Sequence, residues 1–167
     1  VPVALGIDEA GINDDRDMLQ EMRLALTLHR KPGHNTPHPT ASEILRMATE
    51  HGAATTPFAD RIGRLAPGKL ADIVLLDWEA VTWPYQDSTM PLIDVLLRRA
   101  KSGAVQTVLI GGKEIYREGR FTNIDRHSIL EEISRTLDRP DTATEAAQRR
   151  LATGLAEPVR DFYKDWL

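Results

Sequence analysis

The first seven residues form an apolar run, and this run restricts the fold more than any other feature of the sequence. Val1 to Ile7 contains no polar side chain. Such a run suits a strand buried on both faces of a parallel sheet, which belongs to alternating β/α folds. A bare terminus is a poor place for a core strand. We therefore expect Val1, which is not a methionine, to lie inside a longer protein, and the chain alone to be inactive and poorly soluble.

The run ends at Asp8, and the next residues predict a strand-loop-helix unit. Residues 9–14 form a polar loop, and apolar residues recur at helical spacing from Asp15 to Arg30. The acidic start of that segment is typical of a helix N-terminus. Asp8 therefore lies at the carboxyl end of the predicted strand.

The middle of the chain alternates between turns and regular structure. The prolines between Lys31 and Pro39 exclude a regular helix there. A second helix follows, with Thr40 or Ser42 as its cap and Gly52 as its C-terminal stop.

A strand is predicted at residues 71–77, and a hairpin at 105–110 and 113–117. The two strands of the hairpin are separated by Gly111 and Gly112, which can take the positive φ angles of a tight turn. Glu118, Gly119 and Arg120 form one more turn.

The last forty residues return to helix, at 128–137 and 144–167. Pro158 should kink or split the second helix. An apolar stripe follows one face of it, at Leu151, Leu155, Val159, Phe162 and Trp166. Docking of this stripe on its own protein is favoured over a partner interface.

Composition excludes several classes of function. A net charge of -4 gives no electrostatic reason to expect nucleic acid or an anionic membrane as a partner, since both need a clustered basic surface. Neither a membrane span nor a signal peptide is visible, so we expect a cytoplasmic protein. Because the chain has no cysteine, any metal must be held by His, Asp or Glu.

Asp8 is the best candidate for chemistry, because functional groups of α/β barrels lie at the carboxyl ends of strands. A carboxylate there can bind a metal and transfer a proton. From the residues alone, however, a loop or helix-capping aspartate is favoured. Structural roles are favoured for the histidines. His34 and His38 are four residues apart, but the prolines beside them exclude the helix that would place both on one face. His29 and His51 fall near the ends of predicted helices, where a cation stabilises the helix dipole. His127 has the weakest case for a metal.

Three segments resemble the amidohydrolase superfamily, in its branch of guanine deaminase, S-adenosylhomocysteine and methylthioadenosine deaminases and triazine hydrolases. They are Val3-Ala4-Leu5-Gly6-Ile7-Asp8 with the helix at 17–23, then Ala48-Thr49-Glu50-His51-Gly52-Ala53-Ala54, and then residues 62–77, which begin Ile62-Gly63-Arg64-Leu65. The third segment is the most specific. Residues 108–116 resemble a late strand pair of the same family.

The resemblance implies an α/β fold in which the chain is the C-terminal portion of a (β/α)₈ barrel, with its last strand and helices, followed by part of a composite β-sandwich and C-terminal helices. The segments would be residues 1–60, 61–124 and 125–167. Asp8 matches the aspartate that ends the eighth barrel strand and binds the metal, whereas none of the histidines matches the other ligands, which lie upstream of that strand. One divalent metal is implied, with zinc preferred over iron.

The implied reaction is hydrolysis of a C–N bond in an amino-substituted purine, pyrimidine or triazine. Asp8 takes a proton from metal-activated water and passes it to the departing nitrogen. Glu9 and Asn13 are substrate-adjacent candidates, although Glu9 could equally point into solvent and Asn13 could shape the loop. Expected partners are a small heterocyclic substrate, the remainder of the barrel and other copies in a homo-oligomer. A ring-opening cyclic amidohydrolase and a non-catalytic interaction fragment are the alternatives.

Overall fold

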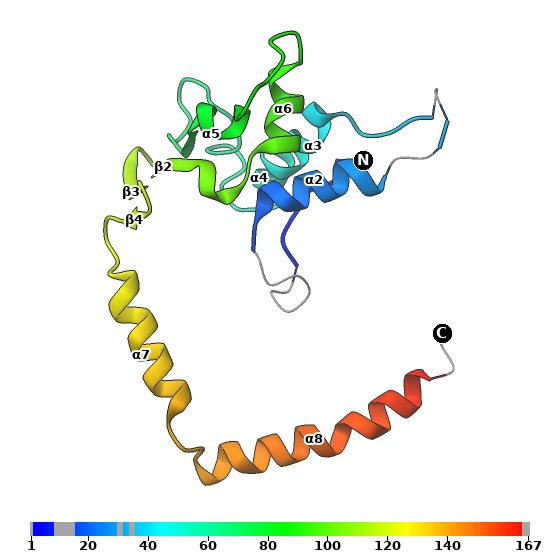
Figure 1. Ribbon diagram of the computed structural model, residues 1–167, viewed down its shortest axis with the longest axis vertical. Coiled ribbons are helices and arrows are strands. Elements are labelled where there is room, and N and C mark those ends of the chain that lie inside the picture. The colour runs from blue at the N-terminus through cyan, green and yellow to red at the C-terminus, as the bar shows by residue number, and fades with distance from the viewer. Residues whose placement is uncertain (1, 9–15, 30–31, 34–35, 165–167) are drawn as a thin grey trace. The chain divides into compact units, whose positions relative to one another are not determined.

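A computed structural model describes residues 2–8, 16–29, 32–33 and 36–164 of the chain. The chain divides into two compact units, Val1–Ile124 and Asp125–Leu167. The first unit contains a group of short helices and a small sheet, and the second consists of two helices (Figure 1). The predicted boundary at residue 60, between a barrel segment and a sandwich segment, stays a prediction.

The core of the first unit is built by helices α2 (Met18–Leu28), α3 (Ala41–Ala48) and α6 (Leu92–Arg99), which lie together in Figure 1. The side chains buried between them are Met22, Leu26, Ala41, Ile44 and Leu97. Ile44 and Leu97 are 0% exposed. Burial of their side chains, about 1.5 to 3 kcal/mol each, is a main source of stability in this unit.

Capping residues set where the first helices begin. Asp17 accepts the backbone N–H of Leu19 at 2.9 Å at the start of α2. At α3, Thr40 and Glu43 form a capping box, in which the Glu43 carboxylate accepts the Thr40 N–H at 2.8 Å. These bonds satisfy helix donors that have no partner within the helix. The predicted cap at Thr40 is confirmed.

A second buried cluster joins α5 (Trp78–Thr82) to α6 and the turn that follows α6. Its members are Val81, Val95, Ala100 and Ala104. The sequence pattern predicts neither α5 nor α6. This second buried cluster is therefore known only from the structure.

The sheet is antiparallel, in the order β1 (Ile73–Leu76), β2 (Val105–Ile110), β3 (Lys113–Arg117) and β4 (Arg120–Phe121). Ile110 pairs with Lys113 across the turn. Gly111 and Gly112 have φ angles of 56° and 78°, which are left-handed values that glycine adopts without strain. The predicted hairpin and the strand before it are confirmed.

Two local predictions are wrong. Residues 2–7 belong to no strand, because a strand needs neighbours and no described residues lie beside this segment as sheet partners. The helix at residue 41 does not run to Gly52 either. It ends at Ala48, because Thr49 has φ -118° and ψ -82°, and a short helix, α4 (Glu50–Ala54), carries Gly52 in its interior.

The second unit contains α7 (Arg126–Asp138) and α8 (Ala143–Tyr163), and no described side chain of either helix is buried. Pro158 lies inside α8 and does not split it, since proline removes only the bond to the carbonyl of residue 154. The apolar stripe is exposed at its four described positions, and Trp166 lies outside the described residues. Docking of the stripe stays a prediction.

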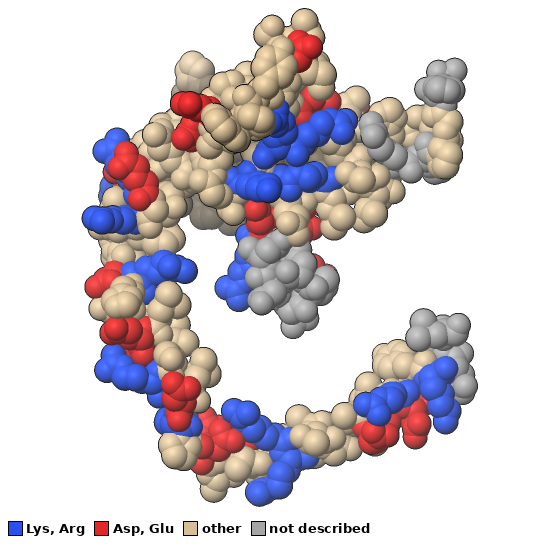
Figure 2. Space-filling view, in the orientation of Figure 1, with Lys and Arg blue, Asp and Glu red and all other residues tan. Residues whose placement is uncertain are grey.

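Charged side chains of both signs alternate along these two helices (Figure 2). Ion pairs within the unit include Arg139 with Glu145 at 2.6 Å and Arg149 with Asp141 at 2.9 Å. Among the described residues, no helix combines the length and the apolar character needed to cross a membrane.

Candidate functional site

Asp8 is exposed and follows a segment that is attached to the helices of the first unit. Leu5 packs against the buried cluster of α2, α3 and α6, and its backbone N–H donates to the carbonyl of Met47 at 3.0 Å. Two residues earlier, the carbonyl of Val3 lies 2.9 Å from Nδ1 of His51. The backbone before Asp8 is therefore tied to the junction of α3 and α4.

Helix α2 is the first described element after Asp8, and it belongs to the core. Glu9 and Asn13 both lie outside the described residues, so their predicted place beside the substrate stays a prediction. On α2, the guanidinium of Arg23 donates to the carbonyl of Ala100, just after α6. This bond ties α2 to the end of α6.

The described residues do not form a complete metal site. No group of three or more His, Cys, Asp or Glu side chains among them could hold a metal ion. His38 lies with its Nδ1 3.2 Å from the carbonyl of Thr36 in its own loop, and His127 pairs with Glu131 at 3.0 Å in the second unit. His34 lies outside the described residues. Asp8 is chemically suited to bind zinc through a carboxylate oxygen, but it is one ligand of a set.

An ion pair fixes the loop of the most specific sequence segment against α4. The guanidinium of Arg64 lies 2.6 Å from Oε2 of Glu50, and this hydrogen bond lowers the pKa of the Glu50 carboxyl below its ordinary value of 4.5. Next to Arg64, Gly63 passes so close to α4 that a Cβ atom there would lie 2.7 Å from the Cβ of Ala53. This segment therefore holds α4, and α4 carries His51.

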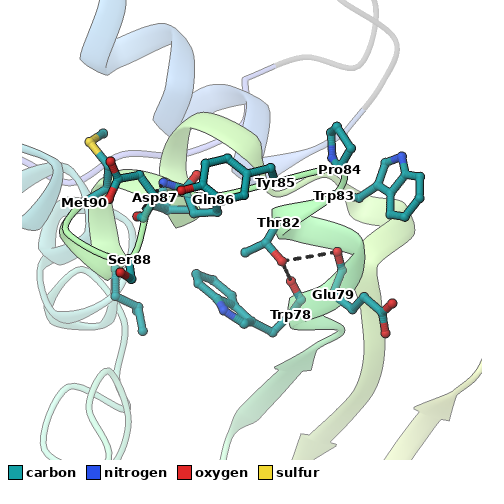
Figure 3. Close-up of a pocket in the computed structure, with 12 residues that line it drawn as sticks. Trp78, Glu79, Thr82, Trp83, Pro84, Tyr85, Gln86, Asp87, Ser88 and Met90 are labelled. Atoms are coloured by element: carbon teal, nitrogen blue, oxygen red, sulfur yellow. Dashed lines mark hydrogen bonds between the residues drawn. The ribbon is translucent and has the colours of Figure 1, made fainter.

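A separate pocket of about 490 Å³ lies between α5, the following loop and α6 (Figure 3). Aromatic side chains from Trp78, Trp83 and Tyr85 contribute to its lining, and Arg99 holds the loop by donating to the carbonyls of Trp83 at 2.5 Å and Tyr85 at 2.8 Å. In Figure 3, the hydroxyl of Thr82 is turned back onto α5. Sequence reasoning missed this pocket, although three aromatic residues within eight positions were a visible signal. No residue of the Asp8 segment lines it.

Residues 1–115 match the Amidohydrolase family. The chain belongs to this family. It is 37% identical over 130 residues to the 5-methylthioadenosine/S-adenosylhomocysteine deaminase of Pelotomaculum thermopropionicum, which covers 78% of this chain and 29% of that protein. It is 34% identical over 119 residues to the S-triazine hydrolase of Gordonia rubripertincta, covering 71% of this chain and 24% of that protein.

Solved structures give the same result for the fold of this amidohydrolase chain. An adenosine deaminase from Xanthomonas campestris with bound zinc superposes with a TM-score of 0.73 and 29% identity, over 83% of this chain and 31% of that one. The zinc complex of atrazine chlorohydrolase from Arthrobacter aurescens gives a TM-score of 0.69 at 26% identity, over 80% of this chain and 29% of that one. The chain thus spans less than a third of these relatives.

The family resemblance and the fold class predicted from the sequence are confirmed. The chain has the fold of the corresponding part of these barrel enzymes, with helices and a small antiparallel sheet. Its relatives are deaminases and triazine hydrolases, and both solved structures named above hold zinc. The assignment of Asp8 as ligand and catalytic residue stays a prediction.

Proposed function

We propose that this chain is the C-terminal part of a zinc-dependent aminohydrolase that deaminates an amino-substituted N-heterocycle. The observation that carries the proposal is the family match over residues 1–115, which includes the Asp8 segment. It is joined by the 37% identity to a 5-methylthioadenosine/S-adenosylhomocysteine deaminase. The barrel, sandwich and helical segments would be residues 1–60, 61–124 and 125–167. A cytoplasmic location and a homo-oligomer are further parts of the proposal.

In this function Asp8 has two tasks. Its carboxylate contributes one oxygen ligand to a divalent metal, with zinc preferred because the related structures named above contain it. When bound, the metal would polarise a water molecule and lower the pKa of that water toward neutrality. Asp8 accepts the proton that the water loses on attack at the aminated ring carbon, and donates it to the departing amine. Glu9 and Asn13 are the nearest candidates for contact with the substrate.

The exposure of Asp8 supports this assignment. A loop or capping aspartate would act on neighbouring backbone N–H groups, and the cap of the following helix is provided by a different residue, Asp17. The alternative of a helix-capping Asp8 is therefore disfavoured for α2. The Asp8 carboxylate is exposed, which leaves it accessible to a metal.

The test uses the full-length protein with zinc bound, in wild-type form and as Asp8→Asn. Ammonia release is measured with 5-methylthioadenosine, S-adenosylhomocysteine, adenosine and an aminated triazine. Loss of the proton-transfer group predicts a fall in kcat of roughly 100- to 10,000-fold, with a lower zinc content. Asp60→Asn is the control, because Asp60 is an exposed aspartate in the loop after α4.

Full deaminase activity in Asp8→Asn would show that the role assigned to Asp8 is wrong. Hydrolysis of a cyclic amide such as a hydantoin, with no release of ammonia from the aminated rings, would favour the ring-opening class of amidohydrolase. Absence of bound zinc and of both activities in the full-length protein would favour a non-catalytic fragment.

A further inference from the structure

The segment before Asp8 is fixed by two hydrogen bonds that come from helices and not from a sheet. The Leu5 N–H donates to the Met47 carbonyl at 3.0 Å, and Nδ1 of His51 lies 2.9 Å from the Val3 carbonyl. The side chain of Leu5 adds an apolar contact with the buried cluster. Both bonds act on backbone groups within five residues of Asp8.

The break between α3 and α4 makes these two bonds possible. Because α3 ends at Ala48, the carbonyl of Met47 lies in the last helical turn, where carbonyls lack an N–H partner from the helix. His51 lies in the first turn of α4. Side chains on a helix lean toward its N-terminus, so the ring of His51 reaches back to the side of the junction on which Val3 lies. One backbone kink at Thr49 thus produces both an acceptor and a donor for the Asp8 segment.

The contact with a carbonyl defines the protonation of the ring. A carbonyl oxygen only accepts hydrogen bonds, so Nδ1 of His51 must carry the proton. Nδ1 is protonated in one of the two neutral tautomers and also in the imidazolium form. The bond therefore persists in both charge states, and its role is geometric.

We infer that His51 is a positioning residue for Asp8: by donating from Nδ1 to the Val3 carbonyl, it holds the backbone that presents the Asp8 carboxylate to the metal. This inference rests on the proposed function of Asp8. His51 has no contact with the reacting atoms and acts through the segment between Val3 and Asp8. Loss of the bond lets that segment shift, and a metal ligand is sensitive to displacements of a few tenths of an ångström.

Three substitutions at His51 separate the hydrogen bond from the volume of the ring. The amide nitrogen of Asn stands at the same number of bonds from Cβ as Nδ1, whereas that of Gln corresponds to Nε2. In the full-length zinc enzyme, His51→Ala and His51→Gln should lower zinc affinity by roughly 10- to 100-fold, the range for lost supporting partners of metal ligands. His51→Asn should stay close to wild type. His127→Ala is the control, since His127 lies in the second unit and pairs with Glu131 there.

The measurements are zinc affinity by competition with a chelator, kcat and KM for ammonia release, and the ¹⁵N spectrum of the histidine rings at a pH where they are neutral. We expect a lower kcat with little change in KM, and a ring protonated at Nδ1 whose signal disappears in His51→Asn. Thermal melting monitors folding. If His51→Ala does not fold, the comparison of Asn with Gln replaces it.

Equal zinc affinity of His51→Asn and His51→Gln would overturn the inference, as would a neutral ring protonated at Nε2. A lower melting temperature in His51→Ala with unchanged zinc affinity would show a purely structural role and would also overturn it. These results leave the proposed function intact as long as Asp8→Asn is inactive. Full activity of Asp8→Asn contradicts the proposed function itself.

Discussion

Gly63 is the position at which one added methyl group should damage this fold most clearly. Its φ angle is +93°, and a Cβ atom would lie 2.7 Å from the Cβ of Ala53, 3.2 Å from the Cα of Glu50 and 3.3 Å from the carbonyl oxygen of Thr49. Two of these three atoms belong to the backbone of the α3–α4 junction and cannot turn away. Gly63→Ala must therefore move the loop or the helix.

The cost of Gly63→Ala can be estimated from three contributions. A side chain in the left-handed region costs about 1 to 2 kcal/mol. Overpacking against atoms that cannot rotate away adds about 1 to 3 kcal/mol. The smaller conformational entropy of the unfolded alanine chain offsets about 0.4 to 1 kcal/mol. The expected loss in the free energy of unfolding is thus about 1 to 5 kcal/mol.

Gly68→Ala is the matched control. Gly68 has a φ of +83°, and no atom lies within 4 Å of the position of its Cβ. It therefore carries the conformational penalty without the steric one, and should lose about 1 kcal/mol. Urea unfolding of the full-length protein, followed by circular dichroism, compares the two variants. Equal destabilisation by the two substitutions would refute the close approach of Gly63 to α4.

Two further predictions concern the core and the cap of α3. Leu97→Ala should lower the free energy of unfolding by roughly 3 to 5 kcal/mol, because Leu97 is 0% exposed, whereas Leu92→Ala at an exposed position of the same helix should have little effect in the same urea experiment. The backbone N–H and the hydroxyl of Thr40 lower the pKa of the Glu43 carboxyl below 4.5. A lowered folded-state pKa means that Glu43 stabilises the protein above about pH 4.5 and loses this effect as the pH falls through the lowered value. In Glu43→Gln, the free energy of unfolding measured by urea should fall less between neutral and acidic pH than in the wild type. An unchanged pH profile would contradict this role of Glu43.

Local sequence signals predicted the elements that depend on local chemistry. The hairpin needed only two residues with positive φ between two β-prone runs, and Gly111 and Gly112 supply them. The start of α3 needed one cap, and Thr40 supplies it. In these cases the backbone hydrogen bonds involve neighbours in the sequence, so the pattern contains all the information.

The elements that were missed depend on partners far along the chain. Helix α5 has only five residues, too few to show a helical period. Helix α6 has eight, and follows a segment with prolines at positions 84 and 91. The two helices stabilise each other, because Val81 of α5 and Val95 of α6 belong to the same buried cluster. Isolated helices of this length are unstable in water, so tertiary packing decides their existence.

The same distinction applies to Asp8 and its support. Asp8 could be selected from the sequence because it ends an apolar run and because a family resemblance gives that position a role. His51, which contacts that segment, could not be selected from the sequence. Its contact with Val3 joins positions 48 residues apart, and such a contact produces no periodic pattern in the sequence. Sequence reasoning placed His51 near a helix end, where a cation stabilises the helix dipole. In the structure His51 does lie near a helix end, in the five-residue α4, and its Nδ1 also contacts the Val3 carbonyl. The role inferred for it depends on a proton at Nδ1 and not on its charge. An experiment at His51 should therefore change the geometry of the donor, as Asn and Gln do, and not only the charge of the side chain.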